Sequence, residues 1–326
     1  MSLVVVTGAS GFLASVIIDQ LLEADYKVRG TVRSSEAARV RVAYGSFGDQ
    51  FNIAVVDDLA TSDLSDAFRG ADALIHVGSP MSTGGGAADM LKACLQGAIS
   101  GTERVLEYAA TAGVKKIVVT ASIISLVNPK LIFTDIKVTA SDWNDQTFED
   151  AIKPDASPFE VYGASKKLAE EAVWKFAESH PDIDIATVHP PFLYGLPGRG
   201  QVIDTPAGST NNDIYNLISG PKGRPLPAPG HPAFTNVADA ARAHVAALKT
   251  PLSGQPKRIL PVGGKPGLKE KLPVLDGSEQ TVAAAELDPS SAALLVGLDK
   301  YISWQETLET TIDEFLRREK ELGIVV

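Results

Sequence analysis

The chain opens with the stretch Val4-Val5-Val6-Thr7-Gly8-Ala9-Ser10-Gly11-Phe12-Leu13-Ala14. Three consecutive β-branched residues are typical of a strand that is buried on both faces of a parallel sheet. A turn containing Gly8 and Gly11 follows, and the apolar periodicity of residues 12–22 predicts a helix. The free N–H groups of a helix N-terminus bind phosphate, and glycines let the backbone come close to it. The stretch therefore predicts a nucleotide-binding strand–turn–helix in preference to an ordinary tight turn.

The end of the second predicted strand, residues 27–32, favours NADP(H) as that nucleotide. In a dinucleotide-binding fold, a side chain about 20 residues beyond the glycines meets the adenosine ribose. An acid at this place accepts from the 2′-hydroxyl of NAD, but this chain has Arg33 and no acid before Glu36. A guanidinium suits a 2′-phosphate because it forms bidentate, charge-assisted hydrogen bonds. We therefore expect NADP(H), with a solvated surface role for Arg33 as the alternative.

The composition narrows the class of protein. The 326 residues, 44% of them hydrophobic, suit one large α/β domain or a nucleotide-binding domain with a smaller lobe. A net charge of −10 disfavours a nucleic-acid or anionic-membrane partner, since either requires a basic face. Cys94 is the only cysteine, which excludes an intrachain disulfide and a thiolate metal cluster. With no leader or membrane-spanning pattern, we expect a cytoplasmic protein.

Strand patterns alternate with helix patterns along the first 190 residues. Strands are predicted at residues 3–7, 27–32, 51–56, 73–77, 116–120 and 185–188, and helices at 12–23, 87–112 and 164–179. This order predicts an α/β fold with a Rossmann-type doubly wound parallel sheet. Residues 1–195 are predicted to form the nucleotide-binding domain, with 236–250 packing back onto it. Residues 196–326 are then expected to form mainly a smaller C-terminal substrate-binding lobe, with helices at 212–218, 237–249 and 304–322.

Small and polar residues stand where these predicted strands end. Ligands of doubly wound sheets bind beyond the carboxyl ends of the strands. The residues at those ends are Thr7, Arg33, Asp57, Gly78, Ser122 and Pro190. Their convergence on one edge of the sheet predicts a ligand cleft there.

Tyr162 and Lys166 form the candidate catalytic pair. They are four residues apart at the start of the helix predicted over 164–179, so their side chains share a face. An ammonium beside a phenol favours the phenolate, which makes a tyrosine usable as a general acid near neutral pH. Ser122, at a strand end facing the same cleft, can hold a carbonyl or hydroxyl oxygen against the tyrosine. A Tyr-x-x-x-Lys pair alone is more often a solvated helix face, but here it follows a dinucleotide-binding motif.

These motifs, in this order, resemble the extended short-chain dehydrogenase/reductase superfamily. The resemblance is narrower to its dihydroflavonol-4-reductase-like branch, and within it to fungal and yeast NADPH-dependent aldehyde and ketone reductases. The segments that carry it are 28–33, 76–80, 142–144, 162–170, 189–195, 209–211, 237–244 and 298–304, together with Thr7-Gly8-x-x-Gly11-x-x-Ala14 and Ser122. They extend over nearly the whole chain.

The resemblance implies NADPH-dependent reduction of an aldehyde or ketone, reversible as alcohol oxidation. Tyr162 would protonate the oxygen, Lys166 would bind the nicotinamide ribose, and Ser122 would orient the substrate. The implied cofactor-binding residues are Thr7, Gly8, Ser10, Gly11, Phe12, Leu13, Arg33, Asp57, Leu59, Gly78, Pro80, Lys166 and Pro190. Many members of the superfamily add an Asn to the catalytic set, and this chain has Ala98 where the extended pattern places it.

The sequence also predicts residues of a substrate pocket, and it leaves two alternative functions open. Aromatic residues that could line an apolar pocket beside Ser122 and Tyr162 are Phe192, Tyr194 and Tyr215, although such residues are as often simple core. The partner expected is a small-molecule carbonyl or alcohol, with the chain a monomer or homodimer. The five histidines show no spacing that suggests a metal. The alternatives are a nucleotide-sugar epimerase or dehydratase, disfavoured by Arg33, and a non-catalytic NADP-binding regulator, disfavoured because Tyr162 and Lys166 are both present.

Overall fold

The structure is a computed structural model that describes residues 2–79, 95, 97–153, 155–221, 224, 233–253, 257–264 and 283–324. Its strands are β1 (Leu3–Val6), β2 (Lys27–Val32), β3 (Phe51–Val55), β4 (Ala73–His76), β5 (Lys116–Thr120), β6 (Lys137–Val138), β7 (Asp184–Val188), β8 (Phe192–Tyr194), β9 (Phe234–Asn236), β10 (Lys257–Ile259) and β11 (Glu286–Leu287). The α-helices are α1 (Phe12–Glu23), α2 (Ala37–Ala43), α3 (Ser65–Phe68), α5 (Ala98–Thr111), α6 (Phe148–Ala151), α7 (Pro158–Ser179), α8 (Asn211–Ile218), α9 (Val237–Ala247), α10 (Ser290–Val296) and α11 (Trp304–Glu321). Two short 3₁₀ helices are η1 (Gly45–Gln50) and η3 (Ile123–Ser125).

Seven parallel strands form the central sheet in the order β10-β7-β5-β4-β1-β2-β3. The chain passes from β1 to β2 on one side and returns to β4 on the other side of β1. This reversal opens a crevice beyond the carboxyl ends of β1 and β4, which is where doubly wound sheets bind ligands. The predicted fold class is therefore confirmed.

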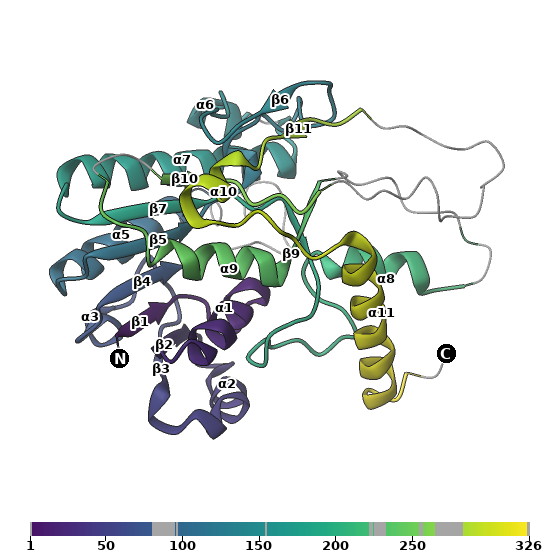
Figure 1. The fold of residues 1–326 in the computed structure, drawn as a ribbon, viewed down its shortest axis with the longest axis horizontal. Coiled ribbons are helices and arrows are strands. Elements are labelled where there is room, and N and C mark those ends of the chain that lie inside the picture. Colours follow the sequence, from purple (N-terminus) through teal and green to yellow (C-terminus); the bar gives the residue numbers. More distant parts are fainter. Residues whose placement is uncertain are drawn as a thin grey trace.

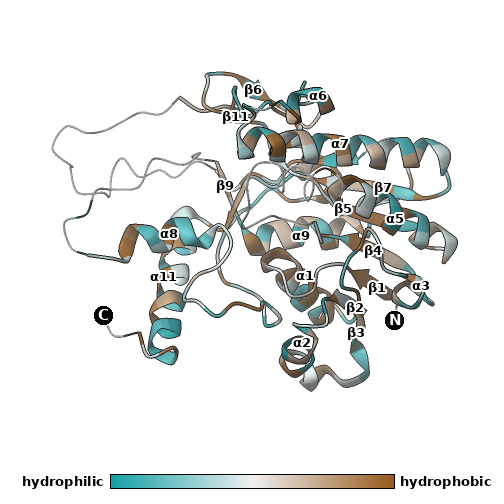
Figure 2. Cartoon of the chain, turned by 180° about the vertical axis from the view of Figure 1, so that it is seen from behind, coloured by the Kyte–Doolittle hydropathy of each residue, from teal (hydrophilic) through white to brown (hydrophobic). Residues whose placement is uncertain are grey.

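Helices cover both faces of the sheet (Figure 1), with α5 and α7 on one face and α1 and α9 on the other. The alternation of β1 explains this arrangement, since successive side chains of a strand point to opposite faces. Val4 and Val6 are buried in the core beneath α1 and α9, and Val5 is buried in the core beneath α5 and α7. The central strands are correspondingly hydrophobic, whereas α11 carries hydrophilic turns (Figure 2).

Elements from beyond residue 195 lie in two places. Helices α8 and α11 lie together at one end of the molecule (Figure 1), where Tyr215 and Phe315 meet edge to face with ring centroids 5.4 Å apart. In contrast, β10 forms the edge strand of the central sheet and α9 packs on α1, where the side-chain amide of Gln20 donates to the carbonyl of Ala238 at 2.9 Å.

One predicted helix boundary needs correction, and another is not tested. The helix predicted over 164–179 begins at Pro158, because Ser157 and Glu160 form a capping box and Pro158 suits the first helical turn. The helix predicted over 87–112 is described only from Ala98 onward, and its first part lies outside the described residues. Among the described residues, no helix has both the length and the apolar character required to cross a membrane.

Candidate active site

The glycine turn after β1 has the geometry of a phosphate-binding turn. Gly8 adopts a φ of +73°, and a Cβ at this position would lie 3.0 Å from the Cα of Gly78. Only glycine fits such a left-handed conformation in such close contact without strain. Gly11 is the N-cap of α1 and offers no side chain to cap it, and its own N–H donates to the carbonyl of Gly8 at 2.9 Å. The first turn of α1 thus keeps N–H groups that an anion can accept.

A buried hydrogen-bond network fixes this turn against the end of β4. The Thr7 hydroxyl oxygen accepts from the N–H groups of Val77 and Gly78, both at 2.9 Å, so its proton donates to Nδ1 of His76 at 2.8 Å. His76 then carries its proton on Nε2, which donates to the hydroxyl of Thr102 at 3.2 Å. Burial, together with the nearby charge of Lys166, lowers the pKa of His76 to about 3, so the ring is neutral. Thr7 and Gly78 are therefore held side by side.

The adenosine end of the predicted site contains both a cation and carboxylates. Arg33 is exposed at the end of β2, and its guanidinium pairs with Glu36 at 2.6 Å. Asp57, beyond β3, accepts from the N–H of Ser34 at 2.7 Å, and this hydrogen bond chiefly lowers the pKa of Asp57. Leu59 lies against Gly78, because a Cβ on Gly78 would approach the Leu59 side chain to 3.2 Å. The structure therefore brings these predicted residues to one edge of the sheet.

Helix α7 presents the catalytic candidates. The Lys166 ammonium lies 5.7 Å from the centre of the Tyr162 ring, as their four-residue spacing predicts. Gly163 allows the close packing of this turn, since a Cβ there would lie 2.6 Å from the amide oxygen of Gln146 and 2.7 Å from Pro129. The position of Tyr162 along the cleft is therefore set by the segment 129–146 as well as by its helix.

Ser122 follows β5 at the carboxyl edge of the sheet. Its hydroxyl accepts from the N–H of Ile124 at 3.4 Å and so caps η3. The next N–H, that of Ile123, donates to the carbonyl of Pro190 at 3.3 Å, which places the predicted nicotinamide-side residue beside it. Tyr162 packs against the cluster that contains Ile123 and Ile124. Ser122, Tyr162 and Pro190 thus meet at one place from three elements distant in sequence.

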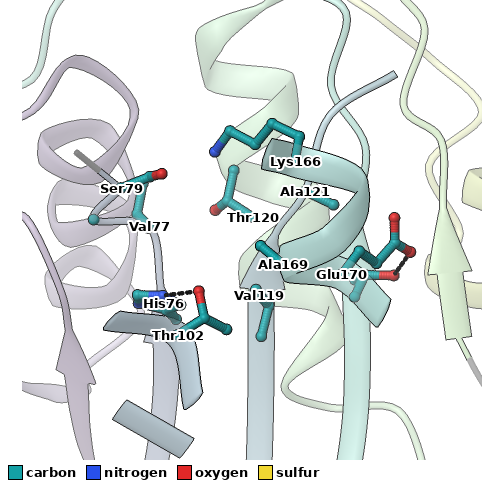
Figure 3. Close-up of a pocket in the computed structure, with 12 residues that line it drawn as sticks. His76, Val77, Ser79, Thr102, Val119, Thr120, Ala121, Lys166, Ala169 and Glu170 are labelled. Carbon is teal, nitrogen blue, oxygen red and sulfur yellow. Dashed lines mark hydrogen bonds between the residues drawn. The ribbon is translucent and has the colours of Figure 1, made fainter. Parts of the chain in front are cut away.

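A small cavity of about 20 Å³ lies between the nucleotide and catalytic regions. Figure 3 shows Lys166 reaching from α7 over Thr120, with His76 and Thr102 on the opposite wall. The Thr120 hydroxyl is 2.9 Å from Nε2 of His244, whose other ring nitrogen faces the carbonyl of Ala240 at 2.7 Å. The half-buried Lys166 side chain therefore lines this cavity together with residues from β4, β5 and α5.

One buried cluster was missed by sequence reasoning. Glu170, one turn beyond Lys166 on α7, is 2% exposed and accepts from the Ser125 hydroxyl, from Nε2 of His189 at 2.8 Å and from Nε of Arg258 at 2.8 Å. Burial raises the pKa of Glu170, but its attraction to His189 and Arg258 and their hydrogen bonds lower it well below the usual range. The four-residue spacing from Lys166 was visible in the sequence. Its partners from β7, β10 and η3 were not.

The predicted aromatic residues of the substrate pocket lie in one hydrophobic cluster that includes Phe315 of α11. The Tyr194 hydroxyl donates to Asp213 at 3.2 Å, and the Tyr215 hydroxyl donates to Glu319 of α11 at 2.6 Å. Phe192 packs against the same hydrophobic cluster. Pro80 lies outside the described residues. Ala98 is buried at the start of α5.

The residues present fit a dinucleotide. The crowded backbone of Gly8 and Gly78, the uncapped start of α1 and the exposed Arg33 suit a pyrophosphate and a charged adenosine end. Within the part of the chain that the structure describes, no group of three His, Cys, Asp or Glu side chains could hold a metal ion.

Comparison with known proteins agrees with this geometry. The sequence model of the NAD dependent epimerase/dehydratase family matches residues 4–263. The chain belongs to this family. Among similar members of the NAD dependent epimerase/dehydratase family, Aldehyde reductase 2 of Sporidiobolus salmonicolor is 35% identical over 67% of this chain and 64% of its own length. The NADPH-dependent methylglyoxal reductase GRE2 of Saccharomyces cerevisiae is 28% identical over 97% of this chain and 98% of its own length.

A solved structure has the same fold over nearly the whole chain. The crystal structure of Gre2 from Candida albicans, in complex with NADPH, superposes with a TM-score of 0.83 at 25% identity. The alignment covers 98% of this chain and 99% of that chain. The resemblance to the extended short-chain dehydrogenase/reductases and to their fungal carbonyl reductases is therefore confirmed.

Proposed function

We propose that this protein is an NADPH-dependent oxidoreductase that reduces an aldehyde or ketone to an alcohol, and reversibly oxidises the alcohol. The observation that carries the proposal is the meeting of Tyr162 and Lys166 on one face of α7 with Ser122 and Pro190 beside them. The names of the two relatives and the NADPH complex of the solved structure point the same way.

The side chains divide the work of such a reduction. The nicotinamide, when bound, supplies the hydride. The Ser122 hydroxyl donates a hydrogen bond to the substrate carbonyl oxygen and holds it at Tyr162, which gives that oxygen its proton. The ammonium of Lys166 binds hydroxyl groups of the ribose and favours the negative charge that Tyr162 acquires. Holding the reacting groups together in this way removes much of the entropic cost of the reaction.

The cofactor site we propose follows the glycine turn and the strand ends. Phosphates lie at the turn and the first turn of α1, the adenosine at Arg33 and Asp57, and the nicotinamide at Pro190. The complete set is Thr7, Gly8, Ser10, Gly11, Phe12, Leu13, Arg33, Asp57, Leu59, Gly78, Pro80, Lys166 and Pro190. The proximity of Thr7, Gly8, Leu59 and Gly78 supports the first part of this set.

The proposal also covers the domain organisation, the cellular location and the oligomeric state. Residues 1–195 with 236–250 form the cofactor domain, and residues 196–326 supply mainly the substrate lobe, with Phe192, Tyr194 and Tyr215 near the substrate. The contact between Gln20 and Ala238 supports the assignment of 236–250. We propose a cytoplasmic location and a monomer or homodimer.

The test is the loss of NADPH absorbance with a panel of aldehydes, diketones and aryl ketones, with NADH in parallel. Tyr162→Phe should reduce turnover about 10²–10⁴-fold while nucleotide binding persists, because it removes the general acid alone. Tyr26→Phe is the matched control, since Tyr26 immediately precedes β2 and so lies at the amino-terminal ends of the strands, opposite the predicted cleft. Nucleotide binding without turnover of any carbonyl would contradict the reductase and favour the regulator. A tightly retained NAD with activity on nucleotide sugars would favour the epimerase.

A further inference from the structure

Glu36 pairs with Arg33, the exposed cation that the predicted site offers to a 2′-phosphate. Its carboxylate is bonded at both oxygens, with Oε1 accepting from Nη2 of Arg33 at 2.6 Å and Oε2 accepting from the hydroxyl of Ser10 at 2.5 Å. Ser10 stands between the two glycines of the phosphate-binding turn. The Glu36 side chain is only 16% exposed, whereas that of Arg33 is 65% exposed. The carboxylate is thus fixed between the turn and the guanidinium.

The charges around this position do not favour a second anion. Asp57 also faces the guanidinium, near enough for the Arg33 charge to contribute to the lowering of the Asp57 pKa. Arg39, the next cation along α2, pairs with Asp204 at 2.8 Å and donates to the carbonyl of Ile203. A 2′-phosphate, with close to two negative charges, would therefore meet a guanidinium that is already paired with one carboxylate and lies within electrostatic range of a second.

We propose that Glu36 is a determinant of cofactor selectivity that weakens the preference for NADP(H) over NAD(H). A 2′-phosphate competes with Glu36 for Arg33, because the carboxylate already accepts from Nη2 and offsets the charge of the guanidinium. A free 2′-hydroxyl meets no such competition and can donate to the Glu36 carboxylate, as the acid of a dinucleotide site does. With Arg33 and Glu36 together, the preference for NADP(H) over NAD(H) is therefore small. Arg33 without Glu36 would give a larger preference. The inference rests on the proposed function only for the class of cofactor.

Calorimetric titration of NADP⁺ and NAD⁺ into the full chain, without a carbonyl substrate, tests this. Glu36→Gln keeps the shape of the side chain and its hydrogen bond to Ser10 but removes the negative charge. The expected result is NADP⁺ bound about 5–10-fold more tightly, NAD⁺ bound no more tightly, and a difference that shrinks in high salt because the site is exposed. Glu23→Gln is the control, since Glu23 is an exposed glutamate at the far end of α1 and changes the net charge equally.

Two other results would contradict the role of Glu36, and only one of them would also contradict the proposed function. An unchanged ratio of the NADP⁺ and NAD⁺ dissociation constants in Glu36→Gln, or the same change in Glu23→Gln, would overturn the role of Glu36 and leave the proposed function intact. Failure of the unmodified chain to bind either nucleotide would overturn both. Circular dichroism and the thermal midpoint of Glu36→Gln establish that the variant is folded before the ratio is compared.

Discussion

The Glu170 carboxylate on α7 accepts a hydrogen bond of 2.8 Å from Nε of Arg258, which lies on β10 at the edge of the sheet. The same carboxylate accepts from the Ser125 hydroxyl, whose oxygen also lies 2.8 Å from the carbonyl of Ser122. Arg258 donates in turn to the carbonyls of Ala140 and Asp142. Helix α7, the Ser122 loop and the edge strand are therefore joined through one buried ion pair.

Glu170→Gln should destabilise the protein by about 3–5 kcal/mol, because it leaves the Arg258 guanidinium buried without a compensating charge. Urea unfolding at neutral pH measures this. The neighbouring Glu171→Gln is the control, since Glu171 is 47% exposed and pairs with Lys167, and should cost less than about 1 kcal/mol. Equal losses in the two variants would show that the buried network contributes no more than a surface pair.

The Glu170 carboxylate should also make the stability of the protein depend on pH in the acidic range. The pKa of Glu170 is lowered on folding, so it contributes stability above the pKa of an unfolded glutamate that is lost as pH falls through the folded value. The unmodified chain should therefore lose stability on acidification below about pH 4.5 more steeply than Glu170→Gln. Unfolding free energies of both proteins at several acidic pH values provide the comparison, and parallel curves would contradict it.

Two buried histidines should make the stability of the protein depend on pH in a higher range, below about pH 6.5. Burial lowers the pKa of His244 to about 4 and that of His76 to about 3, from 6.5 in the unfolded chain. The unfolded state therefore binds more protons below pH 6.5, and stability falls as pH falls through this range. His244→Gln should reduce the slope between pH 6 and 4.5 by about 1.4 kcal/mol per pH unit. Between pH 7.5 and 8.5 both proteins should have similar slopes, and an unchanged slope at lower pH would refute the assignment.

Gly8→Ala should impair both the fold and nucleotide binding. A side chain at a φ of +73°, with its Cβ 3.0 Å from the Gly78 backbone, costs about 1–3 kcal/mol and moves the turn from its phosphate-binding geometry. The thermal midpoint and the dissociation constant for NADPH should both worsen. Gly45→Ala is the matched control, because a Cβ there meets nothing within 4 Å. Unaltered NADPH affinity in Gly8→Ala would mean that the phosphates bind elsewhere.

Ser122→Ala tests the substrate-orienting hydroxyl. Removing one donor to a developing oxyanion should lower kcat about 10²–10³-fold, with little change in NADPH affinity. Ser141→Ala, at an exposed position beyond β6, should leave both unchanged. A loss that appears only in KM would show that Ser122 binds the substrate equally before and during the reaction.

The chemistry-bearing residues could be predicted from the sequence because each depends on a local pattern. Val4 to Val6 followed by Gly8 and Gly11 marks a strand, a turn and a helix within a dozen residues. Tyr162 and Lys166 share a helix face through their spacing alone. That helix begins six residues before its predicted start, because the capping box of Ser157 and Glu160 extends it beyond the apolar periodicity.

What only the tertiary structure decided depends on pairs distant in the chain. The pairing of Arg258 with Glu170, 88 residues apart, requires β10 to reach the sheet edge beside β7. The contact of Glu36 with Ser10, 26 residues apart, requires the β2–α2 loop to fold back over the turn after β1. No periodicity or spacing encodes such contacts, because they form only when the strands assemble in their order. The sequence by itself therefore determined the fold class and predicted the reacting groups, and the assembled sheet decided which charges face one another around them.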